Sequence, residues 1–517
     1  MRSRAARFVP TPVPSHSLPD AAVKASDGLR LALVITLVAT LGRLAVAATL
    51  PVGVDEAYSI GIARQLSLSY FDHPPLHLWL VGLWAKLVGT EELFVLRLPF
   101  VALSAVSTLM LFALGRRLFS PAAGVWAAAL FNVTLVFGVA HGTLILPDGP
   151  LLAAALGAAY VVSRILYDPL PGDQLGRWAL AGLIAGLALL SKYHGVLLIA
   201  GLFIFLLTTP HRKLLLRPGP WLAGIIALVL LAPVLVWNLQ HDWASFRFQS
   251  GRGGWGGELR PLGMVESLVF QSIYLLPWIA LGLILVLLWA LARGPWRERR
   301  WYLACLAILP IAIFTGLTLY QRGLPHWQMP GWVFVLPLLG EALSKLPRVL
   351  RWLAGALVLT SGLLLGGLAT VTTLQARTGQ FDDTVQSLLG SDPTTSLMPW
   401  DGIRDVLAAQ GLPTDDRTFI AAFNWIRAAQ LNRLFGKDIP VLCLCGDARH
   451  FRYLNRPSDF AGWTGLLIDS PSAIADDARQ LQRFTSLEPP VDASLTKNNR
   501  VVTGLSLRVG HDFQPQD

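Results

Sequence analysis

The sequence predicts a polytopic α-helical membrane protein that carries a smaller α/β domain at its C-terminal end. Of the 517 residues, 54% are hydrophobic and only 14% are charged, whereas roughly 25% are charged in an ordinary soluble domain. Apolar runs long enough to cross a bilayer as helices recur between residue 30 and residue 371. From about residue 375 onwards the hydropathy falls, and the chain has the pattern of a water-soluble domain.

Eleven apolar stretches are candidate membrane spans. They cover residues 30–50, 96–115, 121–140, 147–166, 178–191, 194–209, 220–238, 267–291, 301–319, 328–344 and 350–371. Residues 55–95, which follow the first stretch, are too polar for one clean span. Within them, residues 57–70 and 76–88 are amphipathic enough to lie along the membrane interface. No internal repeat stands out, which argues against a transporter built from two similar halves.

The loops between these stretches indicate how the chain is oriented. Loops after the even-numbered stretches hold clusters of basic residues, namely Arg116, Arg117, Arg164, Arg177, Arg212, Lys213, Arg217, Arg293, Arg297, Arg299, Arg300, Lys345, Arg348 and Arg351. Because basic loops stay in the cytoplasm, we expect a cytoplasmic N-terminus and a periplasmic C-terminal domain. The formal net charge of +10 follows from this loop pattern, so we do not expect a nucleic-acid partner.

The chain is therefore expected to have three parts. Residues 1–29 are basic and proline-rich without an apolar core, and we interpret them as a disordered cytoplasmic tail rather than a cleaved signal. Residues 30–372 form the transmembrane domain and residues 373–517 the periplasmic α/β domain. In this last part, residues 418–435 have helical spacing, whereas residues 439–445 and 464–470 resemble buried strands.

Three cysteines are too few for a disulfide framework. Cys305 lies in an apolar run, whereas Cys443 and Cys445 are close enough in sequence to suggest a metal or redox site. A strand that carries both thiols on one face is the alternative explanation, and we favour it.

Two acidic residues, Asp55 and Glu56, directly follow the first apolar stretch. An isolated pair of acids beside a span is most often an ordinary interfacial feature. Here the same loop also carries Arg64 and His73 at the depth of the lipid headgroups. A carboxylate in this position could accept a proton from an acceptor hydroxyl or orient an attacking group, so both acids are candidate catalytic residues.

Two further polar clusters lie at the outer ends of spans. Asp148 begins the fourth stretch directly after Pro147, and helix capping is the alternative explanation for this acid. Lys192, Tyr193 and His194 separate two short apolar stretches. Ionisable residues at membrane depth are costly, which makes them candidate site residues, although a lysine can also extend to the interface. A lysine beside a histidine suits an anionic group such as phosphate.

The last clusters lie in loops on the outer side. Residues 237–257 combine Arg247 and Arg252 with several glycines, which makes this loop basic on the side that is normally poor in positive charge. His326 and Trp327 stand at the start of another span. Interfacial tryptophans need no function, but the histidine is a candidate binding residue.

Signatures of soluble enzymes are absent from the sequence. There is no Walker loop, no GxGxxG after a strand, no HExxH and no GxSxG with triad partners. Nothing in the chain is large enough to form a cytoplasmic nucleotide-binding domain, which argues against direct use of a nucleotide sugar.

In this order, the polar clusters resemble the polytopic glycosyltransferases of the GT-C superfamily, in particular bacterial protein O-mannosyltransferases and the aminoarabinose and galacturonic acid transferases of lipid A. The matching segments are DEAY, DHPPL, RLPF, LPDGPLL, LSKYHGVLL, WNLQHDWASFRFQSGRG and HWQMPGWVFVLPLL, within residues 30–345. Each segment alone is a weak signal, whereas the ordered set is specific. The resemblance implies a GT-C-like fold with about 11 transmembrane helices, interfacial helices in the first outer loop and a loosely similar C-terminal domain.

The resemblance also implies an activity and roles for individual residues. A sugar would move from a polyprenyl phosphate donor to a lipid, glycan or protein acceptor at the outer face of the inner membrane. Asp55 would act as general base or substrate organiser with support from Glu56, and Asp148 would be a second functional acid. The candidate substrate-binding residues are Arg64, His73, Lys192, His194, Arg247 and His326, and the basic ones would hold the lipid phosphate.

One departure from the family pattern leaves the identity of the sugar open. Aminoarabinose transferases typically carry a lysine before the paired prolines, where this chain has His73. A protonated histidine could still bind phosphate, but less well at neutral pH. No cofactor is certain: Asp55, Glu56 and Asp148 could hold a divalent metal ion together with phosphate oxygens, or no metal could be needed.

The expected reaction is one displacement, which inverts the anomeric centre. The main alternative is a lipid or glycolipid flippase or transporter, which would distribute ionisable residues through the middle of its spans. A ligase or phosphotransferase of another fold would share the outer acids but not the ordered motifs. A purely structural scaffold would not need the Lys-Tyr-His break between short spans.

Overall fold

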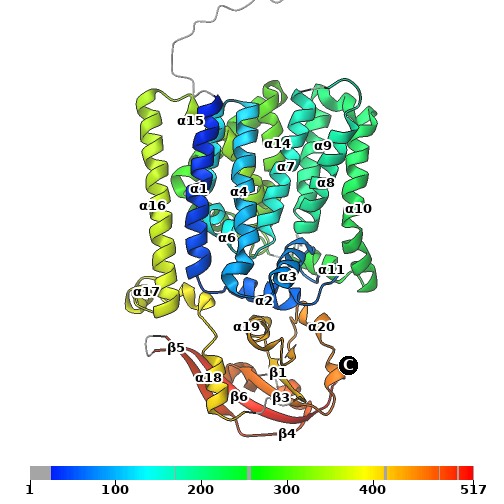
Figure 1. The fold of residues 1–517 in the computed structure, drawn as a ribbon, viewed down its shortest axis with the longest axis vertical. Helices are drawn as coiled ribbons and strands as arrows, with labels where there is room; N and C mark the ends of the chain where they lie inside the picture. Colours follow the sequence, from blue (N-terminus) through cyan, green and yellow to red (C-terminus); the bar gives the residue numbers. More distant parts are fainter. Residues whose placement is uncertain are drawn as a thin grey trace, which may run out of the picture.

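The computed structural model describes residues 25–168, 170–252, 258–412, 416–476, 478–497 and 500–515. Residues 1–24 of the expected tail lie outside this part, and residues 25–29 already belong to the first helix. A bundle of helices forms one part of the molecule, and a sheet domain lies against one end of it (Figure 1).

The helical part contains long helices and several short ones. They are α1 (Ala25–Thr49), α2 (Val54–Ala63), α3 (Leu76–Val88), α4 (Leu93–Leu118), α5 (Pro121–Val133), the π-helix η1 (Val136–Ala140), α6 (His141–Thr143), α7 (Asp148–Tyr167), α8 (Leu175–Ser191), α9 (Gly195–Thr208), η2 (Pro210–Leu216), α10 (Pro218–Gln240), α11 (Ala244–Arg252), α12 (Pro261–Leu275), α13 (Pro277–Arg293), η3 (Gly294–Arg297), α14 (Glu298–Leu317), α15 (Met329–Ser344) and α16 (Arg348–Thr378). Of the two segments expected to be interfacial, residues 76–88 form α3, whereas residues 57–70 are helical only as far as Ala63, the last residue of α2.

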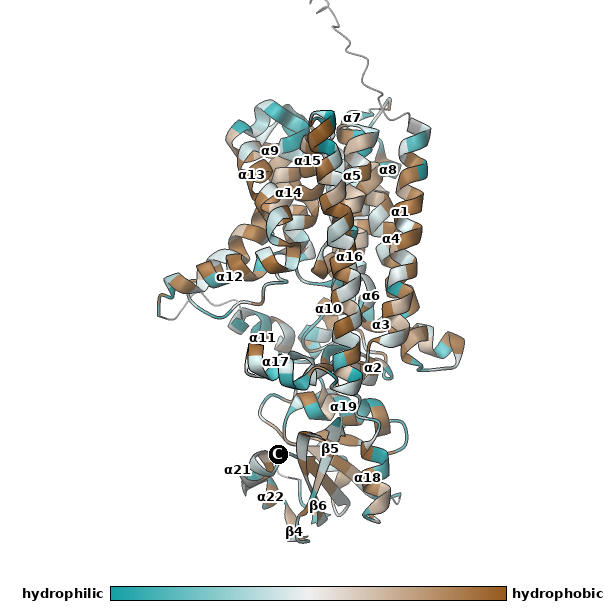
Figure 2. Cartoon of the chain, turned by 90° about the vertical axis from the view of Figure 1, so that its left-hand side faces the viewer, coloured by the Kyte–Doolittle hydropathy of each residue, from teal (hydrophilic) through white to brown (hydrophobic). Residues whose placement is uncertain are grey.

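Six helical segments in the described residues are long and apolar enough to cross a membrane. They are Ser26–Thr49, Leu93–Leu118, Asp148–Tyr167, Pro218–Gln240, Pro277–Leu317 and Arg348–Thr378. Two bent pairs, α5 with the η1–α6 segment (84°) and α9 with η2 (113°), raise the number to as many as eight. Hydrophobic residues dominate the middle of the bundle, and hydrophilic residues gather at the end away from the sheet domain (Figure 2).

The expected span over residues 267–291 is broken into α12 and α13. The break lies at Leu276, whose φ of 66° is outside the helical region, and Pro277 begins the next helix. A proline has no backbone N–H to donate and restricts the residue before it, so the first helix ends there. The expected span over residues 121–140 is also broken, by a bend of 84° between α5 and η1. The other apolar stretches are helical, but α8, α9 and α15 are short.

Close helix packing depends on glycine at several crossings. A Cβ atom on Gly124 of α5 would lie 2.3 Å from the carbonyl oxygen of Phe112 on α4. A Cβ on Gly182 of α8 would lie 2.4 Å from the carbonyl oxygen of Ala223 on α10. Because only a residue without a side chain allows such an approach, these glycines let neighbouring helices pack backbone to backbone.

The described residues of the sheet domain form six strands and several short helices. Its elements are α17 (Asp382–Leu389), η4 (Pro393–Leu397), α18 (Ile403–Ala409), β1 (Thr418–Ala422), α19 (Trp425–Phe435), β2 (Val441–Cys443), α20 (Phe451–Leu454), η5 (Pro457–Phe460), β3 (Thr464–Asp469), α21 (Pro471–Asp476), α22 (Ala478–Leu481), β4 (Phe484–Leu487), β5 (Val491–Lys497) and β6 (Arg500–Phe513). The strand order is β2-β1-β3-β6-β4, and β5 also pairs with β6. Strands β1, β2 and β3 are parallel, and β6 is antiparallel to its neighbours.

Two expectations for the C-terminal part need correction. Residues 418–435 are not one helix, because the fully buried residues 418–422 form strand β1 before α19 begins at Trp425. Cys443 and Cys445 do not share one face of a strand as free thiols. Strand β2 ends at Cys443, and the two sulfur atoms form a disulfide.

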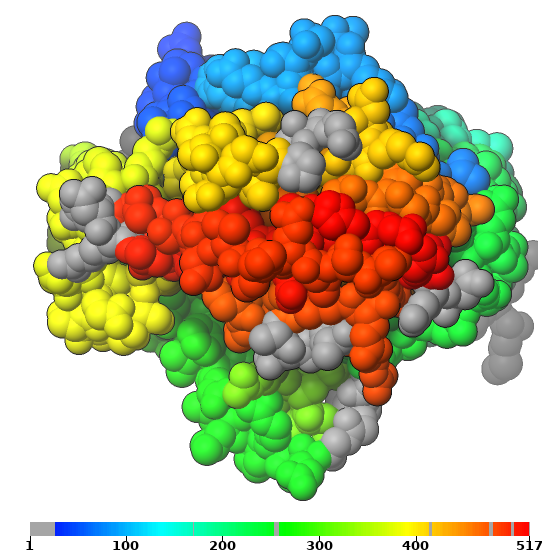
Figure 3. Space-filling model, turned by 90° about the horizontal axis from the view of Figure 1, so that it is seen from below, coloured from blue at the N-terminus to red at the C-terminus, as the bar shows by residue number. Residues whose placement is uncertain are grey.

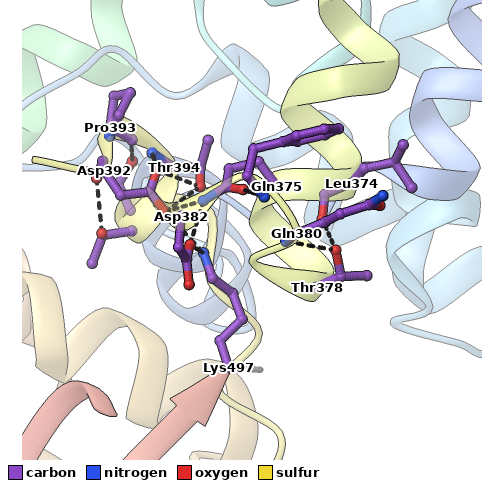
Figure 4. Close-up of polar contacts among 12 residues, drawn as sticks. Leu374, Gln375, Thr378, Gln380, Asp382, Asp392, Pro393, Thr394 and Lys497 are labelled. Atoms are coloured by element: carbon purple, nitrogen blue, oxygen red, sulfur yellow. Dashed lines mark hydrogen bonds and ion pairs between the residues drawn. The ribbon is translucent and has the colours of Figure 1, made fainter. Parts of the chain in front are cut away.

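A polar cluster joins the end of α16 to the sheet domain (Figure 4). Lys497 of β5 donates a hydrogen bond to Asp392 at 2.8 Å and lies 3.7 Å from Asp382. Gln375 of α16 donates to the same two carboxylates, at 2.5 Å to Asp382 and 3.0 Å to Asp392. The sheet is therefore tied to the last turns of a helix that is long enough to span a membrane.

Candidate active site

A cavity of about 760 Å³ lies where the helical bundle meets the sheet domain. Its apolar wall comes from α1, η1, α14 and α16 and includes Val46, Leu50, Val139, Ile313, Leu365 and Leu368. Its ionisable residues are Asp55, Asp72, His73, His77, His141, Asp148, Lys192, His194, Arg252, His326 and Arg449. Seen from the side of the sheet domain, strands and helices of that domain cover the centre of the bundle (Figure 3).

Asp55 lies in the first turn of α2 and lines the cavity. The helix starts there because the Glu56 carboxylate accepts the backbone N–H of Gly53 at 3.2 Å. Burial raises the pKa of the Asp55 carboxyl, and the neighbouring Asp72 raises it further, because both disfavour the charged form. A carboxylate with a raised pKa is suited to accept a proton from a substrate hydroxyl.

Asp72 connects the loop before α3 to the sheet domain. Its Oδ1 accepts a hydrogen bond from the Tyr58 hydroxyl at 3.0 Å, and its Oδ2 lies 3.6 Å from the guanidinium of Arg449. Burial raises the pKa of Asp72, while Arg449 opposes this shift. The hydroxyl of Tyr58 accepts the backbone N–H of His450 at 3.1 Å. The cavity is thus held between the two domains by a continuous hydrogen-bonded path.

Asp148 and Lys192, which also line the cavity, form a buried ion pair. The Lys192 ammonium donates to both oxygens of Asp148 at 3.0 Å, and His141 Nε2 lies 3.6 Å away from the same carboxylate. Asp148 begins α7, and Lys192 follows the end of α8. The tight turn after Lys192 needs Gly195, since a Cβ there would lie 2.7 Å from the backbone of α8.

Five histidines surround this ion pair. They are His73, His77, His141, His194 and His326. Within the described residues, one ring nitrogen of each of the first four is buried without a hydrogen-bond partner. Burial lowers the pKa of His73 and that of His326 to about 3, so both rings are neutral at pH 7. Neutral imidazoles offer one donor and one acceptor each, which suits the hydroxyl groups of a sugar.

Three of the residues selected from the sequence do not line this cavity. Glu56 points the other way and forms a buried ion pair with Arg97 at 2.5 Å, while it also accepts the backbone N–H of Ile145 at 3.1 Å. Arg64 pairs with Glu91 at 2.8 Å and donates to backbone carbonyls of α19. Arg247 of α11 lies outside the lining. The other selected residues, Asp55, His73, Asp148, Lys192, His194 and His326, meet in the cavity.

Five of the acidic and basic cavity residues, and Trp425, were not selected from the sequence. Asp72 and Arg252 lie in motifs that were recognised, but they were not selected as site residues. His77, His141, Trp425 and Arg449 were missed, and the last two come from the sheet domain. The ring centres of His73 and His77 lie 5.7 Å apart, but His73 belongs to the loop before α3 and only His77 to the helix, so helical spacing could not have predicted the pair.

Of the three acids considered for a divalent metal ion, Asp55 and Asp148 line the cavity and Glu56 does not. Among the described residues, no group of three or more His, Cys, Asp or Glu side chains is placed to hold a metal. The oxygens of Asp148 already accept hydrogen bonds from Lys192.

Comparisons with known proteins agree with this architecture. Residues 72–237 match the family described as dolichyl-phosphate-mannose-protein mannosyltransferase. The chain is 25% identical over 332 residues to the lipid A galacturonosyltransferase RgtD of Rhizobium johnstonii, a match that covers 62% of this chain and 64% of the relative. It is 30% identical over 335 residues to the undecaprenyl phosphate-α-4-amino-4-deoxy-L-arabinose arabinosyl transferase of Pseudomonas aeruginosa, covering 60% of this chain and 57% of the relative.

A solved structure shows the same fold over nearly the whole chain. The crystal structure of ArnT from Cupriavidus metallidurans bound to undecaprenyl phosphate aligns with a TM-score of 0.63 and 17% identity, covering 96% of this chain and 100% of that one. These findings confirm the resemblance to GT-C glycosyltransferases that the motifs indicated, and with it a helical membrane protein with a C-terminal sheet domain. The matched region spans less than two thirds of the length of either curated relative.

Proposed function

We propose that the protein is an inner-membrane glycosyltransferase that moves a sugar from a polyprenyl phosphate to a lipid, glycan or protein acceptor at the periplasmic face. The observation that supports this proposal most directly is the composition of the cavity lining. Its apolar wall is built from helices that can span a membrane, and its far side holds buried carboxylates, cations and neutral histidines. An isoprenoid chain fits the first surface, and a phosphate-linked sugar fits the second.

The acceptor hydroxyl attacks the anomeric carbon of the donor sugar in this mechanism. Asp55 accepts the hydroxyl proton, a new carbon–oxygen bond forms, and the bond from the anomeric carbon to the phosphate oxygen breaks. The polyprenyl phosphate departs as an anion stabilised by cationic side chains. The configuration of the anomeric carbon is inverted, because the reaction is a single displacement.

The remaining site residues have supporting roles in this proposal. The Asp148–Lys192 pair and His73, His194 and His326 bind the donor on the membrane side of Asp55. Glu56 is a positioning residue, because its carboxylate joins the start of α2 to α4 and to the loop before Asp148. Arg64 and Arg247 act outside the reaction site: the contacts of Arg64 hold α2 against α19.

We also propose how the chain crosses the membrane. Eleven membrane crossings, with the broken segments counted, place residues 1–29 in the cytoplasm and residues 373–517 in the periplasm. The basic loops support this orientation. The cavity then opens at the outer face, where lipid-linked donors and envelope acceptors meet. The similarity to lipid A transferases supports this enzyme over a flippase.

A transfer assay in membranes tests the proposal. Radiolabelled polyprenyl phosphate sugars are supplied to the wild type, to Asp55→Asn, and to Asp405→Asn as a control at an exposed carboxylate of α18. We expect label in a lipid or protein acceptor with the wild type and the control, and at least a hundredfold lower rate with Asp55→Asn, since a general base contributes roughly 10²–10⁴ in rate. Full activity of Asp55→Asn would refute the assigned base, and no transfer by the inserted wild type from any donor would refute the function.

A further inference from the structure

We infer that a second cavity, lined by α2, α3 and the edge of the sheet domain, binds the phosphate headgroup of an acidic membrane phospholipid. This cavity has a volume of about 310 Å³, and its lining shares no residue with that of the active-site cavity. Helices α2 and α3 lie at the end of the bundle that faces the sheet domain (Figure 1). The inference goes beyond the transfer reaction proposed above and does not depend on it.

The second cavity is enclosed by elements that are packed tightly against one another. Asp55 and Tyr58 of α2 line the active-site cavity, whereas Ala63 and Arg64 of the same helix line the second one. Helix α3 closes against the end of α2 at Gly82, where a Cβ atom would lie 2.4 Å from the carbonyl oxygen of Ala63. One short helix therefore supplies wall residues to two separate cavities.

The ionisable residues of the lining are three cations and one acid, namely Arg64, Lys86, Lys437 and Glu91. Arg64 pairs with Glu91 at 2.8 Å, and every nitrogen of its guanidinium already donates to Glu91 or to the backbone of α19. Lys437 lies 3.3 Å from the same carboxylate. Within the part of the chain that the structure describes, Lys86 forms no ion pair. The lining thus has an excess of positive charge, and the two lysines are its cations with N–H groups left for an anion.

The surface of α3 beside this cavity is apolar. Leu83 and Leu87 are 53% and 77% exposed, and their spacing places them on neighbouring turns of α3 with Lys86 beside them. Exposed leucines on a helix at the bilayer surface insert among acyl chains, and a lysine extends from that depth to the headgroups. A lipid can therefore place its chains along the leucines and its phosphate in the cavity, which a free phosphate ion would not exploit.

A phospholipid with a net negative charge matches this lining best. Lys86 and Lys437 belong to the lining of one small cavity, and lysine binds phosphate as a point charge. A zwitterionic lipid would add its own cation to a cavity that already has an excess of positive charge. Glu92 and Asp438, the acids next to these residues in the sequence, do not line the cavity.

Titration of the detergent-solubilised full chain with phosphatidylglycerol, followed by native mass spectrometry, tests this inference. The variants are Lys86→Gln, Lys437→Gln, the combination of both, and Lys86→Arg; both lysines are exposed, so the fold does not depend on them. The control, Arg456→Gln, changes an exposed basic residue of the sheet domain that lines neither cavity. We expect the tightest phosphatidylglycerol to bind about fivefold more weakly to each single glutamine variant and about twentyfold more weakly to the double variant. The control and Lys86→Arg should retain the wild-type affinity.

Two further ligands identify the chemistry that is recognised. Phosphatidylcholine with the same acyl chains should bind the wild type more weakly than phosphatidylglycerol, and the lysine variants should not change its affinity. Equal affinity of the wild type for the two lipids, or wild-type phosphatidylglycerol affinity in the double variant, overturns the inference. Binding of inorganic phosphate that depends on the lysines, without a preference for phosphatidylglycerol, shows a free-phosphate site and overturns the lipid assignment.

Sugar transfer is measured on the same preparations, so that this inference and the proposed function can fail separately. A wild type that transfers sugar without preferring phosphatidylglycerol loses only the second site. A wild type that binds phosphatidylglycerol through the two lysines but transfers no sugar from any donor loses only the proposed function.

Discussion

Replacing Glu56 by glutamine is expected to destabilise the protein, although Glu56 stands next to the proposed catalytic base. The Glu56 carboxylate and the Arg97 guanidinium are almost completely buried, with 1% and 0% of their side-chain surfaces exposed. Arg97 Nε and a terminal nitrogen donate to the two carboxylate oxygens at 2.8 Å and 2.5 Å. Glu56→Gln leaves the arginine charge buried without its counter-ion, which costs about 3–5 kcal/mol.

A double-mutant cycle measures this effect. Thermal unfolding in detergent is recorded for the wild type, Glu56→Gln, Arg97→Met and the variant with both changes. We expect each single variant to unfold at a clearly lower temperature, and the double variant to be more stable than Glu56→Gln alone, because no unpaired charge remains. A wild-type unfolding temperature for Glu56→Gln, or a double variant that loses the sum of the two single effects, would refute the reasoning.

Three further outcomes are expected. Since the pKa of Asp55 is raised above the ordinary aspartate value of 3.8, the rate of sugar transfer should already fall on acidification at a pH above 3.8. A transfer rate that stays unchanged down to pH 3.8 would contradict the role of Asp55 as base. The pKa of Asp392 is lowered to about 2 by its hydrogen bonds, those from Lys497 first. The ionised carboxylate therefore stabilises the fold by about 1 kcal/mol after allowance for solvent screening, and this contribution is present above pH 3.8 and is lost as the pH falls through about 2. The unfolding temperature of Asp392→Asn should not show this dependence on pH. A thiol-specific reagent should label the folded protein only after reduction of the Cys443–Cys445 disulfide, because Cys305 is buried; labelling without reductant would contradict the bond.

The helical architecture could be predicted because membrane helices are specified by local composition. Every apolar stretch selected from the sequence consists mainly of helix in the structure, but breaks within the stretches and the helix boundaries depend on details that hydropathy does not report. Pro277 was visible inside the stretch 267–291 and could have revealed the break between α12 and α13. The strand β1 was misread because a short run of buried residues is compatible with either a helix or a strand.

The site could be predicted only where a polar residue is unusual in its surroundings. Asp148, Lys192 and His326 stand out beside apolar spans, and all three line the cavity. Arg449 and Trp425 do not stand out, because arginine and tryptophan are ordinary residues in a water-soluble domain. Their role depends on a contact between domains, which no local pattern in the sequence encodes.

The distribution of cavity residues along the chain has a consequence for biosynthesis. The lining begins at Val46 in the first membrane helix and ends at Arg449 in the sheet domain. The membrane helices emerge from the ribosome and insert well before the sheet domain has been made. The complete lining of the cavity therefore exists only after the last domain of the chain has folded onto the bundle.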